Sequence, residues 1–542
     1  MARPFFWIVV VGAFVSFLTG AGVGMNDLSN AFGTTYGAKV LTLSQIVLLA
    51  SVCEFVGAVS LGSAVTATIS GGIAKPADFE DHPYIFMYGM LCACGAAFCW
   101  LVIATWLTLP VSSTHSICGG VIGFALVYGG VDSVSWADNQ DEFPFVKGVV
   151  PIIASWFISP LFTGVVAAVI FGSVRWFVLR HANSVQRAIL TLPIIVAITF
   201  FLESFFVLFK GAESRLHWDV DHAAWVAMWI ATVSGGLSCG FVPLLKWRVE
   251  RIEQRGEVLV QQHVSTPDNV ENEMELHRCV DELPADPDWT EQREAVEPAC
   301  TAPVSSPLPS WPPASSCAPA QSRCSHDSYD KTEAAPGALL RKDTGIEDNA
   351  TLSLGEVHAV TASGLEVQLY NTQAEMVYRY LQVFTAICAS FAHGASDVSN
   401  AVGPLAAINS VYQTGSIQAT SLIPVWVLCL GGAGLVIGLS TFGVRLMRLL
   451  GEQITVITPS RGFSAELSAA LVVSFASCYG IPVSSTHCIT GAVIGISMMD
   501  VGVLNVRWMM VLKMYGGWVF TMLFTALMSA IFFAQGINAP SR

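Results

Sequence analysis

Charged residues are scarce in this chain. They make up 12% of its 542 residues, about half of the share that is usual in soluble globular proteins. Hydrophobic residues reach 53%, and the mean hydropathy is +0.58. This composition excludes a soluble globular protein. The net charge is −14, and acidic residues gather in one polar segment. We expect no nucleic-acid partner.

Patterns of other protein classes are also missing. The 14 cysteines form no CxxC pair and no metal-ligand spacing, which predicts buried free thiols. The apolar N-terminal segment is followed by no A-x-A-like cleavage site, so we interpret it as a retained first helix rather than a signal peptide. We therefore expect neither a structural metal nor a cofactor held by cysteines.

Long apolar runs, in contrast, recur along the chain. A run of about 18 residues or more is long enough to cross a bilayer as a helix. We therefore predict an all-α polytopic membrane protein of about 12 helices, in contact with the lipid bilayer. The spans are expected near residues 5–25, 40–70, 84–108, 113–130, 145–178, 188–209, 222–245, 376–395, 401–412, 422–447, 464–480, 483–500 and 508–535.

One segment, residues 247–372, differs from the rest. It is acidic and rich in Pro and Ser, as in the stretch SSPLPSWPPASSCAPAQS. Such a segment cannot bury enough surface to offset the entropy of ordering it, so we predict a largely disordered loop. The basic stretch KWRVERIEQR at its start favours the cytoplasmic side. The loop divides the chain into membrane halves at 1–246 and 373–542.

Two motifs occur twice, once in each half. PVSSTHSICGGVIG begins at Pro110 and PVSSTHCITGAVIG at Pro482, with eleven of fourteen positions identical. GVGMNDLSNAFG around Asp27 is matched by AHGASDVSNAVG around Asp397. The aspartates are 370 residues apart and the histidines 372, so one unit was copied. We predict two inverted repeats, a common transporter architecture that holds the substrate where the repeats meet.

The PVSSTH motifs have the chemistry of an anion site. Their proline suits the first turn of a helix, where its missing N–H costs nothing. The hydroxyls that follow lie beside free N–H groups at the positive end of the helix dipole. Two such ends facing each other could clasp a tetrahedral oxyanion. The alternative is that these hydroxyls only make hydrogen bonds between helices. The predicted anion site consists of Ser112, Ser113, Thr114, Ser484, Ser485 and Thr486.

The aspartate motifs indicate a cation or proton. Asp27 and Asp397 lie in Gly-rich stretches that we expect to break apolar helices, where a carboxylate is costly and functional by default. Capping of helix ends is the alternative. Asn26, Asn30 and Asn400 add neutral oxygens, which a hard cation such as sodium prefers. A carboxylate beside an oxyanion is repulsive unless a cation or proton lies between them, so the two ligands bind interdependently, as symport requires.

Five further titratable residues lie within apolar segments. Glu54 and Glu466 do not correspond in the repeat, and we interpret both as site or gating residues. His115 and His487 could carry a proton near neutral pH or merely orient the turn. Glu203 lies outside the repeats and is expected to be structural.

Together, MNDLSNAFGT, GASDVSNAVGP and the doubled PVSSTH resemble the inorganic phosphate transporter (PiT) family. The stretch RGFSAELSAALVVSFASCYGIPVSSTHCITGAVIG is similar to its eukaryotic members. The resemblance implies symport of inorganic phosphate with sodium or protons, no cofactor and no enzymatic activity. It implies that Asp27, Asp397 and the six hydroxyls line the phosphate site. It further implies that the cation is bound or coupled by Asn26, Asn30, Glu54, Ser396, Asn400 and Glu466, where sodium is a candidate ligand.

The chain departs from the family motif Gly-Ala-Asn-Asp at Met25 and at Ser396. Serine offers a shorter, single oxygen in place of the asparagine amide, which leaves sodium and protons open as coupling ions. A phosphate transceptor that signals through 247–372 and an intramembrane hydrolase are alternatives. We expect the plasma membrane as host, with an organelle membrane as the alternative. A homodimer and cytoplasmic regulators of the loop are further partners to test.

Overall fold

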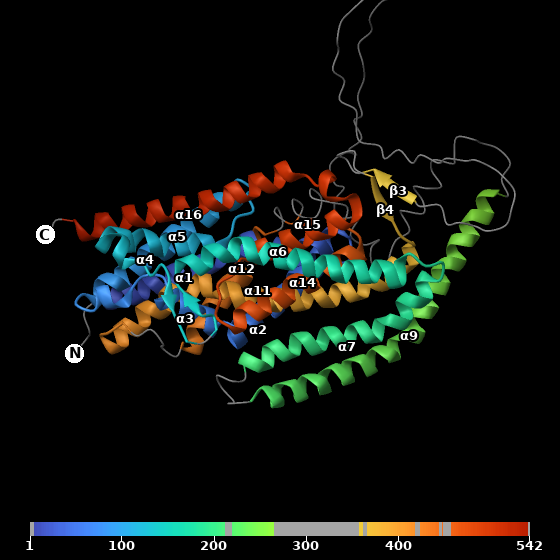
Figure 1. Cartoon of the computed structure of the whole chain (residues 1–542), viewed down its shortest axis with the longest axis horizontal. Helices are drawn as coiled ribbons and strands as arrows, with labels where there is room; N and C mark the ends of the chain where they lie inside the picture. The colour runs from blue at the N-terminus through green and yellow to red at the C-terminus, as the bar shows by residue number, and fades with distance from the viewer. Residues whose placement is uncertain are drawn as a thin grey trace, which may run out of the picture. The chain divides into compact units, whose positions relative to one another are not determined.

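Long helices that pack side by side dominate the computed structural model (Figure 1). The structure describes residues 5–141, 143–211, 219–264, 357–360, 366–417, 423–443, 447 and 457–539. The first half contains α1 Phe6–Gly37, α2 Leu43–Leu61, α3 Ser63–Gly71, η1 Pro76–Phe79, α4 Pro83–Trp106, α5 Ser113–Gly129, η2 Gly130–Ser133, β1 Asp138–Asn139, β2 Val146–Lys147, α6 Val149–Val174, η3 Arg175–Leu179, α7 Ser184–Gly211 and α9 Val220–Val264. The second contains β3 Val357–Val360, β4 Glu366–Leu369, α11 Thr372–Thr414, α12 Val425–Thr441, α14 Pro459–Cys478, α15 Ser485–Val501, η5 Val503–Asn505 and α16 Trp508–Ile537.

Eight helices of the described chain are long and apolar enough to cross a membrane, namely α1, α2, α4, α5 with η2, α6 with η3, α7, α9 and α16. The predicted helical membrane protein is thus confirmed in its coarse form. Two span predictions need correction. Residues 376–395 and 401–412 belong to one helix, α11, which continues through Pro404. Residues 40–70 divide into α2 and the short α3.

The expected helix breaks at Asp27 and Asp397 are wrong, because α1 and α11 run through both without interruption. The neighbouring glycines serve close packing instead. A Cβ atom at Gly24 would lie 2.1 Å from the carbonyl oxygen of Leu435 in α12, and the space at Gly394 is equally tight. The interruptions lie elsewhere, at residues 107–112 between α4 and α5 and at residues 479–484 between α14 and α15.

The helices of the two halves pack reciprocally. Helix α1 packs on α12 and α11 on α2, while α5 packs on α16 and α15 on α6. Arg379, near the start of α11, donates to the carbonyl oxygens of Lys39 and Val40 just beyond the end of α1. At the other end, Gly12 of α1 lies against Ile408 of α11. The two helices that carry the aspartates therefore run in opposite directions.

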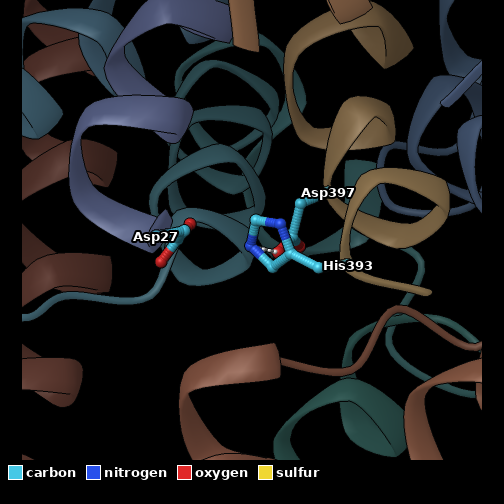
Figure 2. A group of neighbouring side chains, drawn as sticks. All are labelled: Asp27, His393 and Asp397. Carbon is cyan, nitrogen blue, oxygen red and sulfur yellow. Dashed lines mark ion pairs between the residues drawn. The ribbon is translucent and has the colours of Figure 1, made fainter. Parts of the chain in front are cut away.

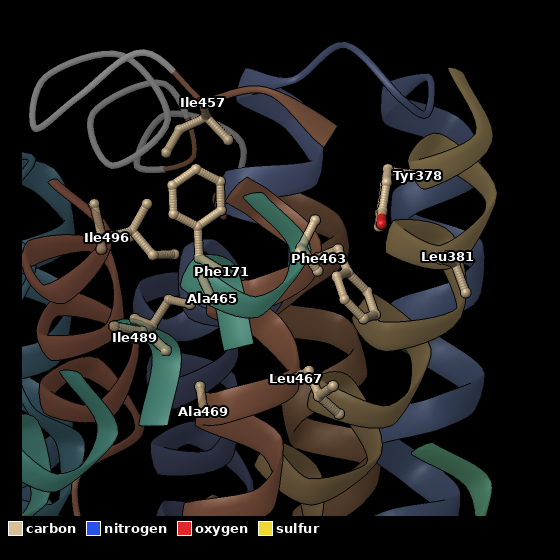
Figure 3. Packing of buried hydrophobic residues seen from close by; sticks show 14 of the residues in the cluster. Phe171, Tyr378, Leu381, Ile457, Phe463, Ala465, Leu467, Ala469, Ile489 and Ile496 are labelled. Atoms are coloured by element: carbon tan, nitrogen blue, oxygen red, sulfur yellow. The ribbon is translucent and has the colours of Figure 1, made fainter. Parts of the chain in front are cut away.

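A hydrophobic cluster holds the α14–α15 hairpin against its neighbours (Figure 3). Phe171 of α6, Tyr378 of α11, Phe463 of α14 and Ile489 of α15 are all buried in it. Because apolar side chains from four helices share this cluster, the first turn of α15 has a firm support.

The predicted loop at 247–372 lies mostly outside the described residues, so its disorder stays a prediction. At its start, α9 continues to Val264. Near its end, β3 and β4 pair in antiparallel register, with Val357 opposite Leu369.

Candidate functional site

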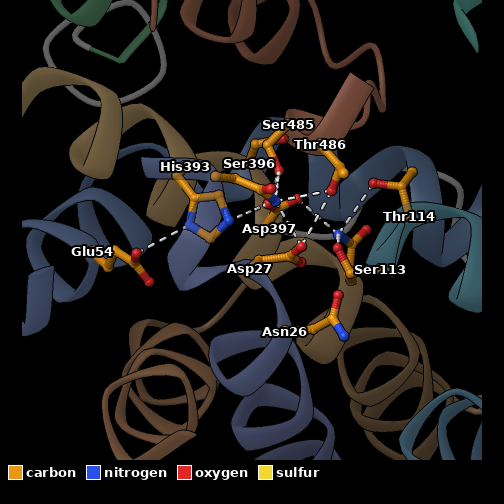
Figure 4. Close-up of polar contacts among 12 residues, drawn as sticks. Asn26, Asp27, Glu54, Ser113, Thr114, His393, Ser396, Asp397, Ser485 and Thr486 are labelled. Carbon is orange, nitrogen blue, oxygen red and sulfur yellow. Dashed lines mark hydrogen bonds and ion pairs between the residues drawn. The ribbon is translucent and has the colours of Figure 1, made fainter. Parts of the chain in front are cut away.

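The aspartates and the hydroxyls of both motifs form one buried cluster (Figure 4). Asp27 and Asp397 are 1% and 0% exposed, although they are carboxylates within apolar helices. Helices α5 and α15 begin at Ser113 and Ser485, so their first turns present hydroxyls and free N–H groups to the same cluster. The fold thus brings together side chains that are more than 370 residues apart in the chain.

Asn30 connects the first aspartate to the second hydroxyl motif. Its Nδ2 atom donates to Asp27 Oδ1 at 2.7 Å and to Thr486 Oγ1 at 2.9 Å, and it lies 3.3 Å from Ser485 Oγ. Thr486 Oγ1 in turn lies 3.3 Å from Asp27 Oδ1. An asparagine of the first copy therefore organises hydroxyls of the second.

Asn400 makes the matching contacts in the opposite direction. Its Nδ2 atom donates to Asp397 Oδ1 at 2.9 Å, and it lies 3.1 Å from Ser113 Oγ and 3.3 Å from Thr114 Oγ1. In addition, Ser485 Oγ donates to Asp397 Oδ2 at 2.8 Å. Each asparagine thus joins the aspartate of its own copy to the hydroxyls of the other copy.

His393 also belongs to this cluster, although the sequence analysis did not select it. Its Nε2 atom lies 2.7 Å from Asp397 Oδ2, and its Nδ1 atom lies 3.2 Å from Glu54 Oε1. The first copy has Val23 at the equivalent position, so comparison of the repeats concealed this histidine. Its spacing four residues before Asp397 on one helix was the available signal.

Three of these residues could together hold a cation (Figure 2). One ligand atom from each of Asp27, His393 and Asp397 can be chosen so that all lie within 4.8 Å of one another. Asp27 Oδ2 is buried and has no hydrogen-bond partner among the described residues. A buried carboxylate oxygen without a partner is costly, which makes it a natural ligand for a small cation or a proton.

Glu466 forms a second polar group that links α14 to α1 and α11. Its Oε1 atom accepts hydrogen bonds from Thr34 at 2.5 Å, from Thr35 at 2.6 Å and from Gln382 at 3.2 Å. Its Oε2 atom accepts from Thr385 at 2.9 Å. Glu466 was predicted from the sequence, but its four donors were not, because single Thr and Gln residues within helices carry no motif.

The model of the phosphate transporter family matches residues 23–529 of this chain. The chain belongs to the phosphate transporter family. It is 30% identical to the phosphate-repressible phosphate permease of Neurospora crassa, over 99% of this chain and 98% of that one. It is 28% identical to the sodium-dependent phosphate transporter 1-B of Danio rerio, over 98% and 95%. A solved structure described as the sodium-dependent phosphate transporter matches with a TM-score of 0.69 at 25% identity, over 99% and 100%. The family predicted from the sequence is confirmed.

In this phosphate transporter, four predicted site residues lie beside the cluster rather than within its hydrogen bonds. Asn26 uses its side-chain amide on residues 107–112, where Oδ1 accepts from the N–H of Val111 at 3.0 Å. Ser112 caps α5, and its Oγ accepts from the N–H of His115 at 3.3 Å. Ser484 stands at the equivalent capping position of α15 and is buried. Ser396 is buried too, and its carbonyl oxygen accepts from Ser399 Oγ at 2.5 Å.

The two motif histidines of the transporter are in contact with each other. The rings of His115 and His487 are 4.7 Å apart between centroids, at 75° to each other. Trp156 covers the first ring and Trp518 the second, each at 3.9 Å. No ring nitrogen of either histidine has a hydrogen-bond partner among the described residues. These histidines therefore pack against each other and against the two tryptophan rings.

A hydrolase finds no support in this geometry. Residues 236–240 do spell G-x-S-x-G, but they lie inside α9 instead of at a strand-to-helix elbow. Ser238 Oγ donates to the carbonyl oxygen of Gly235 at 2.6 Å, as serines within helices commonly do.

Proposed function

We propose that this chain is a secondary active symporter that moves inorganic phosphate across a membrane together with sodium. The observation that carries the proposal is the buried, crossed hydrogen bonding of Asn30 and Asn400 with aspartates and hydroxyls of both copies. Sodium is preferred to the proton because two of the compared proteins are named sodium-dependent phosphate transporters.

The phosphate ion would be bound by hydroxyls and helix ends rather than by basic side chains. Ser113, Thr114, Ser485 and Thr486 stand in the first turns of α5 and α15, where N–H groups lack intrahelical partners. The hydroxyls of Ser485 and Thr486, which donate to aspartate oxygens, can donate to a phosphate oxygen instead. Charge-assisted hydrogen bonds of this kind are shorter and stronger than neutral ones.

The sodium ions would balance the charge of the carboxylates. Phosphate beside Asp27 and Asp397 is strongly repelled in a buried site unless cations are bound with it. Asp27 Oδ2 and Asp397 supply oxygens for one ion. Glu466, surrounded by hydroxyls of Thr34 and Thr385, supplies a second position. Because each ligand lowers the free energy of binding the other, their transport is coupled.

We further propose twelve membrane spans arranged as two inverted repeats. Helices α11, α12, α14 and α15, added to the eight long apolar helices, make twelve. The opposite directions of α1 and α11 and the reciprocal packing of the halves support the inversion. Lys246, Arg248 and Arg251, near the start of the 247–372 insert, support a cytoplasmic insert. We place this transporter in the plasma membrane.

The deciding experiment is phosphate uptake into proteoliposomes that contain the purified chain. An imposed inward sodium gradient should drive accumulation of labelled phosphate above equilibrium, whereas a proton gradient without sodium should not. Accumulation driven equally by a proton gradient would replace sodium by the proton as the coupling ion. Equilibration without accumulation under either gradient would remove symport altogether.

A further inference from the structure

The connection between α14 and α15, residues 479–484, borders two cavities. A cavity of about 620 Å³, here called the polar cavity because several polar side chains share its partly apolar lining, and a mainly apolar cavity of about 400 Å³ are both lined by Tyr479 and Gly480. Protein interiors are otherwise packed as densely as organic crystals. The connection therefore has room to move that most of the bundle lacks.

Side chains of both charges and several neutral polar side chains contribute to the lining of the polar cavity. The hydroxyl of Thr68, the amide of Gln140 and the ammonium group of Lys147 border it. Asp138, which also lines it, stands opposite Lys147 in the β1–β2 pair and moderates the positive charge. The cavity holds on the order of twenty water volumes, enough for a hydrated phosphate ion.

Two contacts tie the start of the connection, residues 479–480, to α3 and to the segment between β1 and β2. Thr68 Oγ1 of α3 donates to the carbonyl oxygen of Gly480 at 2.7 Å. Gly480 has φ of +64°, a left-handed conformation that glycine adopts without strain. The ring of Phe143 meets that of Tyr479 edge to face, with centroids 4.8 Å apart. Just beyond these contacts the chain enters the first turn of α15, which carries Ser485.

The equivalent connection of the first copy, residues 107–112, is held differently. Asn26 of α1 binds it twice, because its Oδ1 accepts from Val111 N–H at 3.0 Å and its Nδ2 donates to the carbonyl oxygen of Leu109 at 3.1 Å. The residue equivalent to Asn26 is Ser396 of α11. Among the described residues, the shorter Ser396 side chain makes no hydrogen bond to residues 479–484. One connection is thus tied to its aspartate helix, whereas the other is held by Thr68 of α3 and by Thr114 of α5, whose Oγ1 donates to the carbonyl oxygen of Val483 at 3.3 Å.

We propose that residues 479–484 are the gate through which phosphate passes between the polar cavity and Ser485, and that Thr68 is the latch of this gate. The inference rests on the proposed function, since the ion that passes is the transported phosphate. Release of the Gly480 carbonyl lets the connection move into the neighbouring space and uncovers the first turn of α15. Among the described residues, Ser396 gives this connection no tether of the kind that Asn26 gives to residues 107–112.

Cysteine labelling tests the gate. Cys478 lines the polar cavity, so the assay uses the full chain with Cys478→Ser. Val483→Cys then places a buried thiol on the gate, and an anionic thiosulfonate reagent reports how often the gate opens. Thr68→Val removes the latch hydroxyl at nearly constant volume and should speed labelling about three- to tenfold, the usual effect of one hydrogen bond. Thr68→Ser keeps the hydroxyl and should restore the slow rate.

Two matched variants make the test specific to this gate. Val111→Cys is the equivalent position of the first copy, and Thr68→Val should leave its labelling unchanged. Ser396→Asn can supply the missing tether and should slow the labelling of Val483→Cys. Inorganic phosphate at saturating concentration should slow it as well.

The outcomes separate the gate from the transport function. Equal labelling with and without Thr68→Val, or equal acceleration at both cysteines, overturns the gate even if uptake is intact. If Thr68→Val speeds the labelling of Val483→Cys but phosphate does not slow it, phosphate does not pass through this connection. In that case we expect the uptake assay to fail as well. Latch effect and phosphate protection together support the proposal, because neither is expected of a static loop.

Discussion

Glu54 and Leu435 occupy equivalent places in the two halves of the bundle. A Cβ atom at Gly394 would lie 2.2 Å from the carbonyl oxygen of Glu54, and one at Gly24 would lie 2.1 Å from that of Leu435. These glycines are 370 residues apart, the same separation as that of the aspartates. Helix α2 therefore packs on α11 as α12 packs on α1, yet one half has a carboxylate where the other has an isobutyl group.

The polar pair Glu54 and His393 corresponds to the apolar pair Leu435 and Val23. We expect His393→Val alone to destabilise the fold by about 3–5 kcal/mol, because it leaves a buried carboxylate without a partner. Adding Glu54→Leu should recover most of this loss, since the double variant reproduces the packing of the other half. Thermal unfolding of purified variants in detergent measures both effects. A double variant no more stable than His393→Val would contradict the equivalence.

Asp27→Asn and Asp397→Asn should each abolish sodium-driven phosphate uptake while leaving expression and folding intact. Each substitution keeps the shape of the side chain but removes the negative charge that would hold a cation. The measurement is uptake into proteoliposomes alongside size-exclusion profiles of the purified variants. Either aspartate would be structural if its variant transported at the wild-type rate with wild-type sodium dependence.

Ser485→Ala should weaken phosphate binding about ten- to hundredfold, the usual result of losing a hydrogen bond to a charged group. Ser113→Ala should act in the same direction. Ser116→Ala is the matched control, because Ser116 Oγ donates to the carbonyl oxygen of Ser112, one turn away from the cluster. The measurement is the apparent affinity for phosphate, taken from uptake curves of the motif variants, the control variant and the wild type. Unchanged affinity in both motif variants would move the anion site elsewhere.

Glu466→Gln should reduce sodium-driven uptake at least about tenfold. The carboxylate accepts hydrogen bonds from four side chains, and an amide replaces one acceptor oxygen by a donor that faces those donors. Glu203→Gln is the control, since Glu203 is a buried carboxylate with one long hydrogen bond from Ser474 at 3.3 Å. Sodium activation curves compare the two. If both variants lost uptake equally, the effect of Glu466 would be general destabilisation.

The duplicated motifs allowed the central cluster to be predicted because its members repeat. Asp27 and Asp397, with the hydroxyls of both PVSSTH motifs, meet in one buried place. His393 could not be found in this way, because the first copy has Val23 at that position. Comparison of the two repeats identifies the residues that both copies share, and it misses functional residues that only one copy has.

The helix breaks were predicted wrongly for a physical reason. Glycine beside an intramembrane aspartate is compatible with unwinding and with close helix packing, and composition alone cannot separate the two. Gly24 and Gly394 serve packing. The donors around Glu466 were equally hidden, since Thr34 and Gln382 become neighbours of one carboxylate only when three helices are assembled.

The crossed contacts of Asn30 and Asn400 have a consequence for the ancestry of this chain. A polypeptide with a single copy of the motifs would carry an asparagine whose hydroxyl partners belong to another molecule. Two such polypeptides, inserted into the bilayer in opposite senses, would have had to find each other before either could bind an anion. Fusion of two such copies into one chain would turn that bimolecular encounter into a tethered one at high effective concentration. The two halves of one fused chain can differ, as they do here where Ser396 and His393 stand opposite Asn26 and Val23 of the first copy.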